Sequence, residues 1–176
     1  MVAAERMRMQ LLFPVTGGPN IAILANGVDY TYNYDPDGAW ASANRFTLQG
    51  DALWSAGATS NPMADMDTVK NAILNATGTE LRIAIMNKAT FKELRLNKNI
   101  KDRFISKSGA AFGYLTDPEI IQVLKDTVDL DGIVLYDKQY RNESKVASKF
   151  VPDGYVALIP TGALGETCYG TTPEEA

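Results

Sequence analysis

The stretch "NPMADMDTVKNAILNATGTELRIAIMNKATFKELRL", residues 61–96, decides the fold class of this chain. Its first half predicts an amphipathic helix, because Asn61 is a good N-cap, Pro62 suits the first helical turn and Gly78 is a typical helix end. Apolar residues recur along one face of this helix: Met66, Val69, Ile73 and Ala76. A strand follows in "ELRIAIM", residues 80–86, and Asn87 then caps a second helix over 88–96.

The sequence after residue 96 continues the alternation of helices and strands. "DPE", residues 117–119, opens a further helix, whose inward positions are Ile120, Ile121, Leu124 and Val128. "GIVLYDKQY", residues 132–140, and "YVALIP", residues 155–160, read as two more strands. Helices packed on a small mixed sheet predict an α+β fold for this half of the chain.

The sequence before residue 61 is richer in strands and turns. "VAAERMRMQ", residues 2–10, is helical in composition but has no N-cap, so we expect the end of a longer, truncated helix. "VDYTYNY", residues 28–34, alternates and places Tyr30, Tyr32 and Tyr34 on one face of a hairpin strand, and "NRFTLQG", residues 44–50, reads as another strand. We place the change of character near Ser60, which divides the chain into residues 1–60 and 61–176.

Composition excludes several classes of function. The 176 residues include no histidine and one cysteine, which removes histidine-based catalysis, histidine metal sites and any intrachain disulfide. The net charge of −4 is unlike that of a dedicated nucleic-acid binder. Hydrophobic residues make up 45% of the chain, yet no apolar run is long enough to span a bilayer, and the start lacks the pattern of a secretory signal.

Candidate chemical motifs each have a plainer explanation. "NYDPDG", residues 33–38, matches the start of a calcium loop, but position twelve is Asn44, so a strand-joining turn is favoured. The glycines around Gly17 and Gly165 lead into no helix that would bind phosphate. Cys168 has no activating base or cation beside it in the sequence. The acids Asp126, Asp129 and Asp131 fit a solvated helix end better than a tuned catalytic pair. We therefore expect a protein that is not an enzyme, with no catalytic, cofactor-binding or metal-binding residues and no cofactor.

Residues 88–107 form the one basic concentration of the chain. Lys88, Lys92 and Arg95 fall on one helical face, opposite Phe91 and Leu94. A solvated helix face is the commoner explanation of such a pattern, and contact with nucleic acid or an acidic surface is the alternative. The candidate subunit-facing or DNA-facing contacts are Lys88, Lys92, Arg95, Lys98, Arg141 and Lys145.

Three stretches of the chain resemble the major capsid protein of lambda-like tailed bacteriophages. The stretches are "AERMRMQ" at residues 4–10, residues 64–104, and residues 131–175. The last stretch contains three motifs in this order: "D..YR", "FVPD..V.L.P" and "ALG.T.YG.TPEE". The matching positions of the last stretch are Asp137, Tyr140, Arg141, Phe150, Val151, Pro152, Asp153, Val156, Leu158, Pro160, Ala163, Leu164, Gly165, Thr167, Tyr169, Gly170, Thr172, Pro173, Glu174 and Glu175.

This resemblance implies a subunit of a phage or prophage head shell that self-assembles into hexamers and pentamers around DNA in the virion, after synthesis in the bacterial host cytoplasm. It implies the tailed-phage capsid fold, with residues 61–176 as an axial domain and residues 1–60 as the β-rich part of a peripheral domain. It also implies scaffold, decoration and portal proteins as partners, no membrane, and a chain that is a fragment of its family's full length. The alternatives left open are a small binding module that uses the face of Tyr30, Tyr32 and Tyr34, and a metal-dependent enzyme that uses carboxylates.

Overall fold

A computed structural model describes residues 2–15, 17–25, 28–108, 115–141 and 146–164 of the chain. The N-terminal elements are α1 (Val2–Leu12), β1 (Asn20–Ala25), β2 (Val28–Asn33), α2 (Ala39–Asn44) and a short 3-10 turn, η1 (Gly50–Ala52). The remaining elements are α3 (Pro62–Thr77), β3 (Ile83–Met86), α4 (Lys88–Leu96), α5 (Lys98–Ser108), α6 (Asp117–Val128), β4 (Gly132–Leu135), β5 (Gln139–Arg141), β6 (Ala147–Lys149) and β7 (Val156–Ile159). The predicted α+β class is confirmed.

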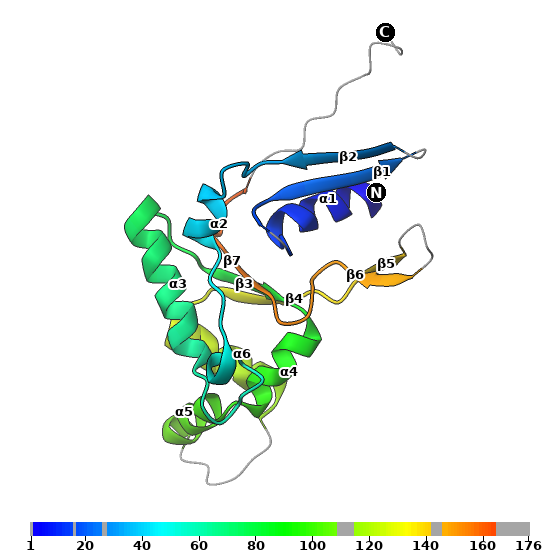
Figure 1. Cartoon of the computed structure of the whole chain (residues 1–176). Coiled ribbons are helices and arrows are strands. Elements are labelled where there is room, and N and C mark those ends of the chain that lie inside the picture. Colours follow the sequence, from blue (N-terminus) through cyan, green and yellow to red (C-terminus); the bar gives the residue numbers. More distant parts are fainter. Residues whose placement is uncertain (1, 16, 26–27, 109–114, 142–145, 165–176) are drawn as a thin grey trace.

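A three-stranded sheet in the order β4-β3-β7 carries the main core, and the helices α3 to α6 gather on one side of it (Figure 1). β3 runs parallel to β4 and antiparallel to β7. Ala84 and Met86 of β3 are both 0% exposed and contact the helices, together with their neighbours in register on β4 and β7. The helices contribute the buried residues Met66, Phe91, Leu94, Ile100, Ile120, Val123, Leu124 and Val128.

Local end signals explain why the helices begin and end where they do. The Asn61 side chain accepts a hydrogen bond from Ala64 N, and Gly78 ends α3 with a positive φ of 71°. Asn87 caps α4 by accepting from Thr90 N. Thr116 and Glu119 form a capping box at the start of α6, so the helices predicted over 62–77, 88–96 and 117–128 are confirmed.

The predicted apolar stripe of α3 is buried at one end only. Met66 is 2% exposed, whereas Ile73 is half-buried and Ala76 is exposed. The second half of α3 therefore extends past the core, with Leu74 39% exposed, because the helix is longer than the sheet and α6 beneath it.

The hairpin of β1 and β2 confirms the strand predicted over residues 28–34, and α1 confirms the predicted N-terminal helix. α1 packs against β1, and the Arg6 guanidinium donates to Ala22 O at 3.4 Å. The turn at Asp35 leads from β2 into α2 instead of into a strand, because the buried Asp35 carboxylate accepts from Trp40 N at 2.7 Å and Ala41 N at 2.9 Å.

Two other predictions of elements differ from the structure, and one helix of the structure was not predicted. The strand expected over 44–50 is wrong: Asn44 ends α2, and residues 45–49 have no strand partner among the residues that the structure describes. The strand expected over 132–140 is two strands in different sheets, since β4 pairs with β3 and β5 pairs with β6. The sequence pattern does not predict α5, because the helix is mostly polar and, among its residues with described burial, only Ile100 is fully buried. Among the described residues, none of these helices is long and apolar enough to cross a membrane.

Candidate functional site

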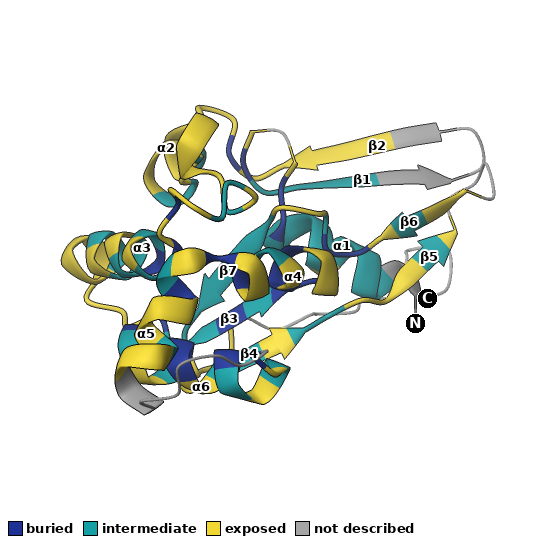
Figure 2. Cartoon of the chain, turned by 90° about the horizontal axis from the view of Figure 1, so that it is seen from below, coloured by how far each residue is buried: buried dark blue, intermediate teal, exposed yellow. Residues whose placement is uncertain are grey.

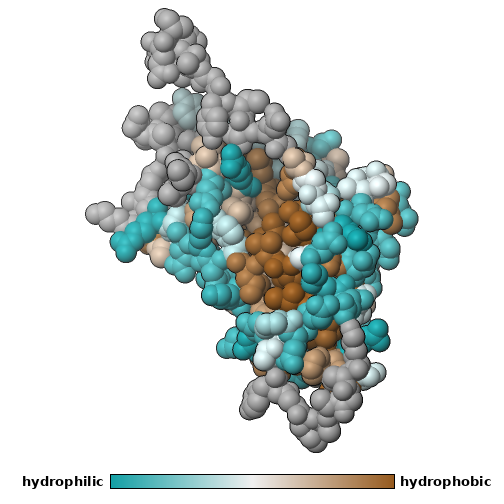
Figure 3. Space-filling model, turned by 180° about the vertical axis from the view of Figure 1, so that it is seen from behind, coloured by the Kyte–Doolittle hydropathy of each residue, from teal (hydrophilic) through white to brown (hydrophobic). Residues whose placement is uncertain are grey.

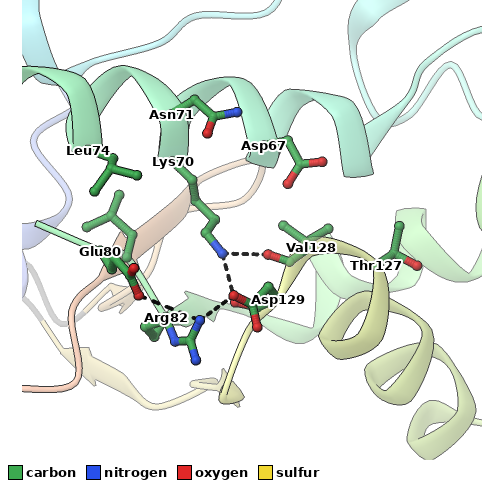
Figure 4. Close-up of a pocket in the computed structure, with 10 residues that line it drawn as sticks. Asp67, Lys70, Asn71, Leu74, Glu80, Arg82, Thr127, Val128 and Asp129 are labelled. Atoms are coloured by element: carbon green, nitrogen blue, oxygen red, sulfur yellow. Dashed lines mark hydrogen bonds and ion pairs between the residues drawn. The ribbon is translucent and has the colours of Figure 1, made fainter.

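A pocket of about 230 Å³ lies between α3, the start of β3 and the end of α6 (Figure 4). Lys70 of α3 extends into it and donates to Val128 O at 2.5 Å and to Asp129 O at 2.7 Å. These carbonyls close α6, where a cation is favoured by the helix dipole. Asp129 ends the helix with a φ of 54°, the one positive φ of a non-glycine residue in the described chain.

Arg82 forms the other half of this pocket and pairs with three carboxylates. Its Nη1 bonds to Asp129 and lies 3.7 Å from Glu80, while its Nε donates to Asp131 at 3.4 Å. The negative charges of Asp129 and Asp131 raise the pKa of the guanidinium further above its ordinary value. Since both cations already have partners, the pocket joins three elements of the fold and offers no free charge to an anion.

The predicted acid cluster is therefore only partly brought together. Asp129 and Asp131 meet at Arg82, whereas Asp126 accepts from Gln122 within α6 at 2.7 Å. Both carboxylates at Arg82 are therefore held in ion pairs within the chain, and neither is left without a partner in the pocket. In the parts of the chain described here, no three His, Cys, Asp or Glu side chains come together as metal ligands.

The basic segment lies on α4 and α5. Its cations whose burial the structure describes are all exposed: Lys88, Lys92, Arg95, Lys98, Lys101 and Arg103. Phe91 is 2% and Leu94 0% exposed on the opposite side of α4. Three of the candidate contacts are paired within the chain: Lys88 lies 3.8 Å from Asp137, Arg95 pairs with Asp117, and Lys98 pairs with Asp102.

Two other candidate contacts are exposed, and one cannot be placed. Lys92 has no ion-pair partner within the described part of the chain, and Arg141 is exposed at the end of β5. Lys145 lies outside the described residues, as does Cys168.

A second polar cluster joins α1 to the segment between β4 and β5, and the sequence pattern does not predict it. The Glu5 carboxylate accepts from Tyr136 OH and, at 2.9 Å, from Lys138 Nζ. The hydrogen bond from Tyr136, and to a smaller extent the one from Lys138, lowers the pKa of the Glu5 carboxyl. Burial, followed by the hydrogen bond to Glu5, raises the pKa of the Tyr136 hydroxyl. The Arg6 guanidinium lies 5.8 Å from the ring centre of Tyr140, which packs against Phe150 at 4.9 Å.

The tyrosine face of the hairpin is open to solvent. Tyr30, Tyr32 and Tyr34 are 53%, 56% and 61% exposed. Figure 2 shows β2 as the outer strand of the hairpin, exposed along its described residues. Three large aromatic side chains on one exposed strand are an unusual surface for an isolated domain, since aromatic residues are enriched at interfaces.

The face of the three-stranded sheet that points away from the helices is also apolar. Its side chains are Ile83, Ile85, Val134, Ala157 and Ile159, and Val134 is 43% exposed. Figure 3 shows an apolar patch at the centre of the molecule, over this sheet. Sheets that contain parallel pairs are usually covered on both faces, so this face is a second candidate interaction surface.

Comparison with known proteins gives one match over almost the whole chain. The family model described as phage major capsid protein E matches residues 3–176. Among solved structures, a phage-related protein from Bordetella bronchiseptica RB50 is similar, with 18% identity and a TM-score of 0.47. That similarity covers 64% of this chain and 34% of the other, so the matched region spans about a third of the Bordetella protein. No curated protein matches.

Proposed function

The chain belongs to the phage major capsid protein E family, and from this premise we propose that it is a head-shell subunit that self-assembles into hexamers and pentamers around packaged DNA. The family match over residues 3–176 is the observation that carries this proposal. Phage capsid proteins are structural, so the work of the chain is repeated contact between copies and not chemistry.

The surfaces of the structure support a role in assembly. An exposed aromatic strand and an apolar sheet face are features that subunit interfaces cover. By contrast, the pocket at Arg82 is closed by ion pairs within the chain. A symmetric, homomeric assembly is the expected product of such a subunit.

We assign residues 61–176 to the axial domain of the capsid subunit and residues 1–60 to the β-rich part of the peripheral domain. The core cluster supports this division, because its fully packed members all come from residues after 60. Ser60 itself is 1% exposed and accepts from Asn97 Nδ2 at 3.1 Å through its carbonyl and at 2.9 Å through its hydroxyl. The segment that leads into α3 is thereby anchored to the turn between α4 and α5.

The basic residues are proposed as the part of the subunit that faces DNA or a neighbouring subunit. Lys92 is the strongest candidate, because Lys88, Arg95 and Lys98 are paired within the chain. Scaffold, decoration and portal proteins are the further partners that a head subunit requires, and the location proposed for the mature protein is the virion capsid, after synthesis in the host cytoplasm.

Assembly is tested by sedimentation of the chain over a concentration series, followed by negative-stain electron microscopy with and without a scaffolding protein. Symmetric capsomers or shells are expected. A chain that remains monomeric at every concentration, with scaffold present, would refute the proposal.

The basic face is tested separately with Lys92→Glu and the matched control Lys88→Glu. If the face contacts DNA, the change at Lys92 weakens salt-dependent binding of duplex DNA more than the change at Lys88 does. If both variants bind DNA as tightly as the unmodified chain, this face does not contact DNA.

A further inference from the structure

The outer edge of β2 has backbone groups that no described residue pairs. Tyr34 N donates to Pro19 O at 2.9 Å, and Ile21 stands opposite Tyr32 and Ile23 opposite Tyr30. Because hydrogen-bonded and non-bonded pairs alternate along an antiparallel ladder, Tyr30 and Tyr32 direct their backbone groups toward β1. Asp29, Thr31 and Asn33 therefore direct their N–H and C=O groups toward the outer edge.

Of the features that usually prevent strand pairing, the described part of this edge has a single charged residue, Asp29. The strand "VDYTYN" contains no proline and no lysine, and its register with β1 runs without a bulge from Asn20 opposite Asn33 to Ala25 opposite Val28. Within the described residues, β1 is its one strand neighbour. An edge with so few of these features among the described residues is a template for another extended strand.

We propose that β2 pairs antiparallel with β2 of a second copy of this chain, about a twofold axis at Thr31. This inference rests on the proposed function, which supplies the second copy. In this register Thr31 faces Thr31 of the partner subunit, and Asp29 faces Asn33 of the partner subunit. Each of these facing pairs can exchange two backbone hydrogen bonds.

The composition of the strand selects this register over its neighbours. An axis at Asp29 would place two carboxylates opposite each other, which destabilises a strand pair, and would leave part of the edge unpaired. An axis at Thr31 keeps the two Asp29 residues apart and uses all three outward-facing residues. The edge is thus complementary to itself, as a twofold contact requires.

The tyrosines contribute to the same contact. With the axis at Thr31, Tyr30 stands opposite Tyr32 of the partner subunit at non-hydrogen-bonded positions, where side chains on two strands come closest. The two exposed stripes would then join into one aromatic surface across both copies. Backbone pairing and side-chain pairing favour the same partner and the same register.

The first experiment is amide hydrogen exchange at single-residue resolution, below and above the concentration at which the chain associates. Association is expected to slow exchange at Thr31 and Asn33 by about tenfold or more, and to change Tyr30 and Tyr32 little, since their amides are already bonded to β1. If associated chains form while the Thr31 amide still exchanges freely, the inference is wrong and the proposed function stands. If no association occurs at any concentration, both are wrong. Protection of Thr31 already in the monomer means that the chain covers its own edge, which also overturns the inference.

The second experiment compares Thr31→Pro with the control Thr31→Ala. Proline removes an outward-facing N–H without removing a bond to β1, whereas alanine keeps that N–H. We expect Thr31→Pro to raise the dissociation constant about tenfold or more and Thr31→Ala to change it less than about twofold. Unchanged near-ultraviolet circular dichroism in both variants shows that the fold is retained. Equal association of the two variants would refute the strand pairing.

Discussion

Replacing Asn87 by alanine is the sharpest test of how this fold is held together. Asn87 is 0% exposed at the point where β3 ends and α4 begins. Its Oδ1 accepts from Thr90 N at 2.8 Å, and its Nδ2 donates to Val151 O at 3.0 Å and to Asp153 Oδ1 at 2.6 Å. One side chain therefore caps a helix and fixes the loop that leads to β7.

The expected loss follows from these contacts. Removal of the N-cap costs about 1 kcal/mol. Val151 is 0% exposed, so its carbonyl loses a partner that water cannot replace, which adds about 1–3 kcal/mol. Asp153 is exposed and still accepts a hydrogen bond from Lys149, so the loss of its bond from Asn87 adds little to the cost in stability. We expect Asn87→Ala to lower the free energy of unfolding by about 3 kcal/mol.

The matched control is Asn61→Ala, which removes an exposed N-cap whose bond to Ala64 N is 3.4 Å long. Its expected cost is about 0.5 kcal/mol, because water replaces the lost bond. Urea denaturation followed by far-ultraviolet circular dichroism measures both variants. A loss at Asn87 no larger than the loss at Asn61 would show that the buried amide does not fix the loop.

Three further predictions concern other parts of the molecule. Glu5→Gln should lower stability at pH 7. The stability that the lowered pKa of Glu5 contributes is present above its ordinary pKa and is lost as pH falls through the folded-state pKa, so the difference between the variant and the unmodified chain should shrink with falling pH; urea midpoints across a pH series check this. Leu124→Ala in the core should lower the free energy of unfolding by about 2–5 kcal/mol. Leu96 is 54% exposed, so Leu96→Ala should lower it by less than about 0.5 kcal/mol in the same assay. Similar losses in the two variants would contradict the assigned core. Calcium should leave Trp40 fluorescence unchanged, because the Asp35 carboxylate already accepts from two backbone amides, and a saturating change would restore the calcium-loop interpretation.

Helix ends were the part of the fold that could be predicted best from the sequence. Asn61, Asn87 and the Asp117-Pro118-Glu119 segment act on backbone groups within a few residues, so their effect is readable locally. The prediction of a strand over 44–50 is wrong because its β-forming residues have no strand to pair with in the described part of the chain. Strand propensity mostly measures packing against partners, and these are set by the rest of the fold.

The ion pairs show the same limit more clearly. Lys98 and Asp102 lie four residues apart on one helix, and such a pair can be expected from spacing alone. Arg95 pairs with Asp117 on another helix, and Lys138 pairs with Glu5 on α1. The partners of Arg95 and Lys138 depend on the tertiary arrangement. In the structure, three cations of the basic run are paired within the chain: Lys88, Arg95 and Lys98.

The tyrosine hairpin lies between these two cases, and this explains why the sequence indicates an interface without identifying it. Alternation along residues 28–34 predicts that the tyrosines share a face, and the structure confirms it. Which of the intervening residues direct their backbone groups outward depends on the phase of hydrogen bonding with β1, and the bond from Tyr34 to Pro19 establishes that phase. Since the outward-facing residues are Asp29, Thr31 and Asn33, a single twofold register satisfies every edge group and keeps like charges apart. The proposed strand pairing would thus use both the tyrosine face and the outer edge of β2.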